Sequence, residues 1–173
     1  MKTMVAIAAI LLAATSSHAS GQSDVIGNWS TVGNSSHVEI YPCGEKLCGK
    51  VVWLKNPNYM HAEDGPVGTM KVDRKNPDPT LRNRPILGLQ VIEGLTADYE
   101  GSWEKGKCYD PETGKTYKCK MHLASPERLE MRGYVGIPLF GRTYVLTREN
   151  NQTPRLKAES IKPKETGTGS ISN

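Results

Sequence analysis

Hydrophobic and polar residues alternate with a period of two through most of this 173-residue chain. Val38 and Ile40, for example, fall on one side of their segment, and His37, Glu39 and Tyr41 fall on the other. Such alternation is typical of a strand with one buried and one solvent-facing side. It predicts about eight short strands, near residues 27–32, 37–42, 46–55, 87–95, 97–105, 107–109 continuing past a turn into 115–124, 127–135 and 138–148.

The two ends of this region indicate how the strands are arranged. Gly27-Asn28-Trp29 lies in the first predicted strand, and Thr147-Arg148 ends the last one. In a closed barrel the first and last strands pair, so the guanidinium of Arg148 could lie on the Trp29 indole and donate to carbonyls at the barrel floor. Glycine at position 27 allows a close backbone approach there. This Gly-x-Trp and late arginine resemble the lipocalin and wider calycin signature. We therefore predict an all-β fold, an eight-stranded antiparallel lipocalin-like barrel, in preference to a sandwich.

One segment breaks the alternation. Residues 56–84, between the third and fourth predicted strands, are rich in Asn, Pro, Asp and Gly and are too long for a hairpin turn. Loops of this length in compact domains are usually functional or disordered, so this loop is interpreted as a lid or an Ω-type loop. Pro79 is suited to the first turn of a short helix within it.

The ends of the chain predict export. Lys2, an apolar run from Met4 to Ala14, and Ser17-His18-Ala19 have the form of a secretory signal peptide cleaved after Ala19. The apolar run is shorter than the roughly 20 residues of a transmembrane helix. We expect a signal peptide at 1–19, one barrel domain at 20–149 and a disordered polar tail at 150–173, in a protein that is periplasmic or secreted.

Charge excludes two classes of partner from the prediction. The chain has a formal net charge of +4, and the segments before residue 20 and after residue 149 carry most of that excess. A nearly neutral folded body lacks the electrostatic footprint of a protein that binds nucleic acid or an anionic membrane. We predict neither partner and no membrane span.

The four cysteines lie in the predicted mature chain, which favours disulfides in an oxidising compartment. Spacing favours Cys43 with Cys48, and Cys108 with Cys119 if a symmetric hairpin turns at Thr113-Gly114. Free thiols and a four-cysteine zinc site are the alternatives, although the ten-residue second gap fits zinc poorly. No other set of metal ligands and no cofactor motif is visible, so neither a metal nor a cofactor is predicted.

Several ordered motifs together resemble a secreted bacterial family, the domain of unknown function 2147, over roughly residues 27–148. They are Cys43-Gly44, Leu47-Cys48-Gly49-Lys50-Val51-Val52-Trp53-Leu54, Asp73-x-x-Asn76-Pro77, Leu81-Arg82-x-Arg84-Pro85-Ile86-x-Gly88-Leu89, Tyr109-Asp110-Pro111-x-x-Gly114-Lys115-Thr116-Tyr117 and Arg132-Gly133-Tyr134-x-Gly136-x-Pro138-Leu139-Phe140-Gly141-Arg142-Thr143. The resemblance implies a periplasmic, lipocalin-like barrel with no established activity. The chain departs from that pattern at Cys108, where an aliphatic residue is frequent, and at Leu146, where a tryptophan is frequent.

Two groups of residues are candidates for binding. Period-two counting places one group on the buried strand faces, where it could line an apolar ligand: Trp53, Tyr99, Trp103, Met121 and Met131. A second, polar group would gather at the barrel rim if the long loop folds back: Asp73, Asn76, Arg82, Arg84 and Asp110. That group could hold an anionic head group through arginine, or its members could be caps and ion pairs that hold the loop shut.

These observations favour a soluble exported protein that binds a small, partly apolar or amphipathic molecule in the barrel lumen. An eight-stranded barrel has room for side chains or for one small ligand, so a filled barrel acting as an interaction module for another envelope protein is the first alternative. The second alternative is an enzyme that uses Asp110 or His61, although no nucleophile motif supports it.

Overall fold

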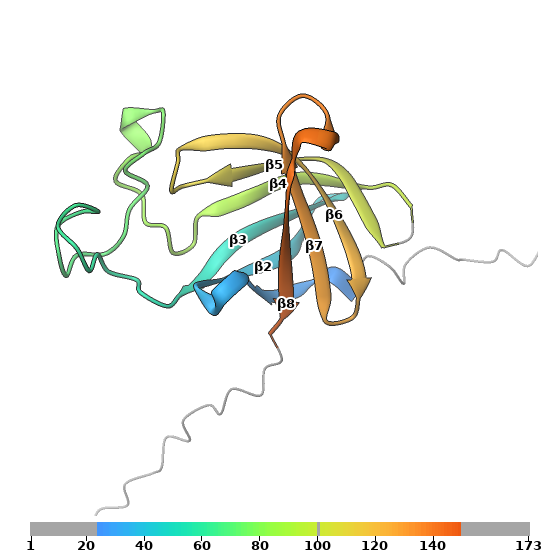
Figure 1. Cartoon of the computed structure of the whole chain (residues 1–173), viewed down its shortest axis with the longest axis horizontal. Helices are drawn as coiled ribbons and strands as arrows, with labels where there is room; N and C mark the ends of the chain where they lie inside the picture. Colours follow the sequence, from blue (N-terminus) through green and yellow to red (C-terminus); the bar gives the residue numbers. More distant parts are fainter. Residues whose placement is uncertain (1–23, 100, 150–173) are drawn as a thin grey trace, which may run out of the picture.

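The computed structural model describes residues 24–99 and 101–149, and it forms one closed antiparallel barrel (Figure 1). The predicted signal peptide and C-terminal tail lie outside the described residues. Eight strands follow one another around the barrel: β1 (Gly27–Ser30), β2 (Ser36–Cys43), β3 (Lys46–Leu54), β4 (Gln90–Ala97), β5 (Ser102–Asp110), β6 (Lys115–Ser125), β7 (Arg128–Tyr134) and β8 (Arg142–Arg148). Three short 3-10 helices interrupt the connections: η1 (Val32–Asn34), η2 (Pro79–Leu81) and η3 (Pro138–Phe140).

Each strand pairs with its neighbours in sequence, and the barrel closes where β1 meets β8. Trp29 lies opposite Arg148 and Ser30 lies opposite Thr147 in that closing pair. The predicted eight-stranded all-β barrel is therefore confirmed, and no sheet edge is left between β1 and β8.

Several predicted strand limits are wrong. The strand expected over 138–148 begins only at Arg142, because the helix η3 occupies residues 138–140. The strand expected over 97–105 begins only at Ser102, since β4 ends at Ala97 and the chain then turns, with the Ser102 amide donating to the Tyr99 carbonyl at 2.8 Å. The segment 107–109 belongs to β5 and not to the strand after it.

The inward faces of the strands pack tightly at the end of the barrel where β8 finishes. The fully buried side chains there and along the middle of the barrel include Val25, Trp29, Ile40, Leu47, Ile92, Leu95, Leu129 and Leu146. Glycines make room for the largest of them: a Cβ added at Gly49 would lie 2.9 Å from Ile92 Cδ1, and one at Gly106 would lie 2.6 Å from Leu95 Cγ. We call this end, which Trp29 closes, the closed end.

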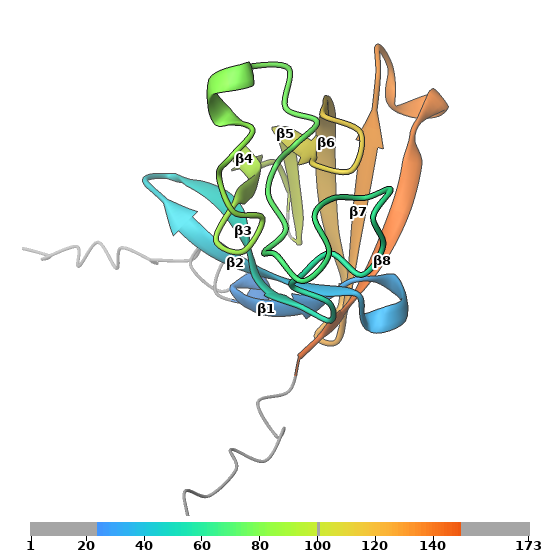
Figure 2. The same cartoon turned by 90° about the vertical axis from the view of Figure 1, so that its left-hand side faces the viewer.

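The long connection from β3 to β4 runs along one side of the barrel, toward the viewer in Figure 2. It has structure of its own, with antiparallel bridges from Asn58 to Met70 and from Val72 to Pro85. The buried Tyr59 ring anchors it, because its hydroxyl both donates to the Val72 carbonyl and accepts from the Val72 amide. As expected, a short helix, η2, begins at Pro79, and the Asp78 side chain caps it.

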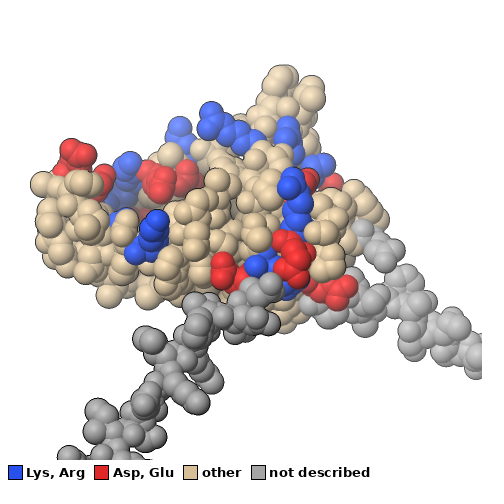
Figure 3. All heavy atoms as spheres, turned by 60° about the horizontal axis from the view of Figure 1, so that its bottom comes forward, with Lys and Arg blue, Asp and Glu red and all other residues tan. Residues whose placement is uncertain are grey.

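Charges of both signs are interspersed on the face shown in Figure 3. That face carries no large field of one sign, in agreement with the nearly neutral body expected from the sequence. Within residues 24–99 and 101–149, no helix is long and apolar enough to cross a membrane.

Candidate functional site

The floor of the barrel is a cation–π pair between its first and last strands. The Arg148 guanidinium lies 4.3 Å from the centre of the Trp29 ring. It also donates to the carbonyls of Pro126, Ile26 and Asp24, which belong to the turn before β7 and to the segment leading into β1. The Trp29 Nε1 donates to the Val25 carbonyl at 2.8 Å. This is the arrangement expected from the sequence, and it makes the closed end a structural element with its polar atoms satisfied.

The opposite half of the interior is different, because inward side chains become partly exposed. Register and alternation place Cys108, Tyr117, Met131 and Tyr144 on inward faces: Met131 pairs with Met121 and with Tyr144, and Cys108 pairs with Tyr117. Tyr144 is 50% exposed, and the other three are half-buried. We call these four residues the open-end face.

The predicted ligand-lining residues divide between the interior and the surface. Trp103 and Met121 are each only 2% exposed in the core, and Met131 packs against that core from the open side. Trp103 has a further property: its indole N–H is buried and has no acceptor among the residues that the structure describes. A buried donor without an acceptor is uncommon in folded proteins and marks a place where a polar atom would be stabilised.

Trp53 and Tyr99 were expected on the buried faces, and the structure corrects both. Trp53 is 39% exposed and stacks on His37 with ring centres 4.4 Å apart. The register between β2 and β3 slips by one residue between His37 and Val38, so a bulge turns Trp53 outward. Tyr99 is 67% exposed because it lies in the β4–β5 turn and not in a strand.

The predicted rim residues gather around one buried carboxylate, that of Asp73. Tyr109 donates its hydroxyl to Asp73 Oδ1 at 2.6 Å, Asn76 Nδ2 donates to Oδ2 at 2.7 Å, and Arg84 donates Nε to Oδ2 at 2.9 Å and forms an ion pair with it. Asp73 itself is fully buried. We call Asp73, Asn76, Arg84 and Tyr109 the loop latch, because the first three belong to the long loop and Tyr109 belongs to β5.

The other two predicted rim residues, Arg82 and Asp110, do not contact Asp73 and have hydrogen bonds of their own. Arg82 donates Nε to the Asn76 carbonyl, and Asp110 caps the β5–β6 turn by accepting from the Glu112 amide and the Thr113 hydroxyl. A hollow of about 460 Å³ beside the latch has Glu93 as well as Lys107 on its walls. The arrangement therefore corresponds to the second sequence interpretation, in which these residues hold the loop in place.

Tyr109 belongs to the latch but not to the polar group predicted from the sequence, although it begins one of the family motifs. Desolvation, followed by the hydrogen bond to Asp73, raises the pKa of Tyr109 to about 12. The latch also fixes the chain locally: a Cβ at Gly114 would lie 1.9 Å from the Lys75 carbonyl oxygen, so only glycine lets the β5–β6 turn meet the long loop there.

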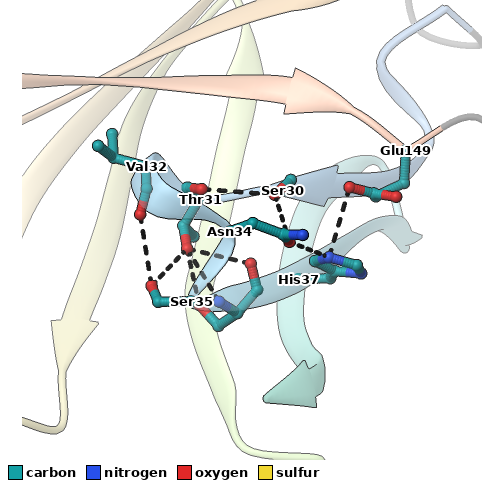
Figure 4. Close-up of polar contacts among 8 residues, drawn as sticks. Ser30, Thr31, Val32, Asn34, Ser35, His37 and Glu149 are labelled. Carbon is teal, nitrogen blue, oxygen red and sulfur yellow. Dashed lines mark hydrogen bonds and ion pairs between the residues drawn. The ribbon is translucent and has the colours of Figure 1, made fainter. Parts of the chain in front are cut away.

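A third polar cluster, not anticipated from the sequence, joins β1, β2 and the end of β8 (Figure 4). His37 Nε2 lies 2.6 Å from Asn34 Oδ1 and 3.4 Å from Glu149 Oε1. Ser30 donates its hydroxyl to the same Asn34 oxygen at 2.9 Å. Since Ser30 bonds to Asn34 and not to the imidazole, the cluster lacks the hydroxyl-to-base contact of a nucleophilic site, and it ties the η1 turn to the strand ends.

The cysteines confirm one predicted disulfide and correct the other. Cys43 and Cys48 are bonded across the β2–β3 hairpin, with 5.8 Å between their Cα atoms. Cys108 and Cys119 are free thiols. The β5–β6 register pairs Cys108 with Tyr117 and Cys119 with Gly106, so the two cysteines are diagonal neighbours and not the directly opposed pair that a hairpin centred on Thr113-Gly114 would give.

Comparison with known proteins gives a consistent assignment. The model of a bacterial family, described as "Uncharacterized protein conserved in bacteria (DUF2147)", matches residues 27–148. Among solved structures, the chain is similar to protein HP1028 from Helicobacter pylori, described as belonging to the lipocalin family. The two share 25% sequence identity with a TM-score of 0.61, over 73% of this chain and 84% of the other. No curated protein matches the chain.

Proposed function

Since the chain belongs to the DUF2147 family of bacterial proteins and has a lipocalin-like barrel, we propose that it is an exported protein that binds one small, partly apolar molecule. The molecule would enter at the open-end face and rest on Trp103 and Met121. This proposal rests chiefly on the gradient of exposure along the interior, from fully buried at Trp29 to half exposed at Tyr144. A barrel that served only as a packed scaffold would have no reason to leave inward aromatic surface in contact with water.

The chemistry of this half of the interior supports an amphipathic ligand. Tyr117, Met131 and Tyr144 offer aromatic and thioether surface, which suits apolar groups of irregular shape. The Trp103 N–H offers one hydrogen-bond donor in the same row of side chains as Met121 and Met131. A ligand with an apolar body and one acceptor oxygen or nitrogen would satisfy that donor.

Export is supported by the Cys43–Cys48 disulfide, because such bonds persist in oxidising compartments. The lipocalin-like neighbour supports the binding of a small molecule only at the level of the fold. The identity of the ligand is best approached by native mass spectrometry of protein taken gently from its own compartment.

Displacement of an environment-sensitive naphthalene sulfonate dye tests the site. Met131→Trp should fill the open-end face and weaken dye binding by about tenfold or more, since a large ring would occupy the ligand volume. Val135→Trp is the matched control, because Val135 is exposed beyond the end of β7 and the same ring there leaves the interior unchanged. Equal dye binding in wild type and Met131→Trp would show that the dye does not bind in the lumen.

A second candidate function, binding of another envelope protein, is favoured by the loop between β7 and β8. Val135, Ile137, Leu139 and Phe140 are each between 55% and 79% exposed there, and Arg132 holds the loop by donating to the Pro138 and Leu139 carbonyls. Contiguous exposed apolar side chains commonly mark protein contacts. Photo-cross-linking from position 139 in cells tests it: one specific protein adduct, lost in Phe140→Ser, would favour this function.

A further inference from the structure

Sulfur-bearing side chains gather on the inward faces of β5, β6 and β7. The Cys108 thiol donates to the Met131 sulfur at 3.6 Å, and Cys119 lies diagonally opposite Cys108 on the neighbouring strand β6. Cys119 is fully buried, and Met121 follows it on the same face of β6. Three strands thus direct two thiols and a thioether to one place.

Glycines create the space for this contact. Gly106 and Gly133 lie on either side of Cys119 in the same row of the barrel. A Cβ at Gly106 would lie 3.2 Å from the Cys119 sulfur, so even one methyl group there would crowd the thiol. Because neither Gly106 nor Gly133 carries a side chain of its own, Cys108 and Met131 can approach one another across β6.

We propose that Cys108, Cys119 and Met131 form a binding site for a soft monovalent metal ion of the Cu(I) type. Thiolate and thioether sulfur select soft ions, whereas zinc sites use four thiolate or imidazole ligands and calcium or magnesium sites use oxygen. The described residues hold no group of three His, Cys, Asp or Glu side chains that would suit those other ions. Cys108 and Met131 are half-buried members of the open-end face, which provides an entry path.

Binding requires a change in protonation but no change in oxidation state. One thiol loses its proton to solvent as its sulfur bonds to Cu(I), and the resulting thiolate neutralises the single positive charge of the ion. The second thiol and the Met131 thioether complete the sulfur coordination as neutral ligands. A neutral complex suits this apolar interior, because an uncompensated buried charge would be costly.

Anaerobic titration of the reduced mature protein with Cu(I), in competition with a chromogenic Cu(I) chelator, tests this site. One ion per chain should bind, with only sulfur neighbours in the X-ray absorption spectrum. Cys108→Ser and Cys119→Ser should each weaken binding by at least the roughly 10- to 100-fold that loss of an outer-shell partner costs in metal sites, and Met131→Leu should weaken it less. Met60→Leu, in the exposed part of the long loop, should leave the affinity unchanged.

Two results would overturn the proposal. One is Cu(I) affinity that survives both serine substitutions in variants whose unfolding curves show an intact barrel. The other is thiol counting that finds Cys108 and Cys119 oxidised to each other in protein isolated from its own compartment. Failure of the Cu(I) proposal can be distinguished from failure of the proposed binding of an apolar ligand. Met131→Leu conserves volume, so it should keep dye binding while it weakens Cu(I) binding.

Discussion

At the scale of single residues, Trp29 and Arg148 should behave as one energetic unit. Trp29→Ala removes a fully buried indole and should lower the free energy of unfolding by about 3 to 5 kcal/mol. Arg148→Ala removes the cation over that indole and three hydrogen bonds to backbone carbonyls. Since both changes remove the same contact, the double variant should cost less than the sum of the single variants in denaturant unfolding. Strictly additive losses would mean that the stacking of Arg148 on Trp29 contributes nothing to the free energy of unfolding.

Tyr109 gives a prediction about pH. Its pKa in the folded protein, about 12, is above the ordinary value of 10, so the neutral hydroxyl stabilises the fold. That stabilisation is complete below pH 10 and is lost as the pH rises from 10 through 12. Unfolding free energies of wild type and Tyr109→Phe, measured at pH 8 to 12, should therefore differ most at pH 8 and converge at the upper end. Other groups that titrate in this range affect both proteins and cancel in the difference.

The sequence identified some residues of the interior and misplaced others for a physical reason. Trp103 and Met121 are buried as the alternation predicts, because the extra residue at the β5 bulge lies after Trp103. Trp53 and Tyr99 follow the same alternation in the sequence, but they do not face the interior. A bulge precedes Trp53 in β3, and β4 ends before Tyr99. Bulges depend on pairing between strands, which a single segment does not encode.

At the scale of elements, the loop latch should determine whether the long loop stays on the barrel. Asp73→Asn keeps the shape of the side chain but removes the charge that faces Arg84, leaving the guanidinium without its carboxylate. We expect a loss of about 2 to 3 kcal/mol, below the range for a fully buried ion pair because Arg84 reaches solvent. Hydrogen exchange should accelerate mainly at the Tyr59 and Asp73 amides, with the barrel strands little changed.

The control for this experiment is Asp64→Asn, which makes the same chemical change at an exposed position of the same loop. It should leave both stability and exchange close to wild type. If Asp73→Asn were equally silent, the loop would be held by Tyr59 and its backbone bridges alone.

Some structural elements can be predicted from the local sequence, and the contacts between distant elements cannot. The existence of eight strands and of the η2 helix follows from local patterns, namely alternation and Pro79 after an Asp cap. The latch does not, because it joins Asp73 to Tyr109 across 36 positions in the chain. The free state of Cys108 and Cys119 depends on a one-residue shift in the centre of the β5–β6 turn, which moves the partner of Cys108 from position 119 to Tyr117. Turn position is poorly determined by composition.

At the scale of the whole molecule, the proposed export predicts the start of the mature chain. Protein recovered from the periplasm or the medium should begin near Ser20, because small residues precede that position. N-terminal sequencing tests this directly. Recovery of a chain that still carries residues 1–19 in those fractions would contradict cleavage after Ala19.

The final prediction concerns the division of the barrel interior into a packed and an open half. Gly106 and Gly133 are both inward-facing strand glycines, and both lie beside Cys119. An added Cβ meets different surroundings: 2.6 Å to Leu95 at Gly106, but no closer than 3.8 Å to Tyr117 at Gly133. Gly106→Ala should therefore destabilise the fold by about 1 to 3 kcal/mol through overpacking.

Gly133→Ala should leave stability within about 0.5 kcal/mol of wild type, because ordinary van der Waals contact replaces open space and the substitution reduces the freedom of the unfolded chain. Both changes add the same methyl group to a strand, so the contrast between them isolates packing. Thermal unfolding of the two variants measures it. Equal destabilisation would mean that the interior is filled along its whole length, which would favour an interaction module over a ligand-binding barrel.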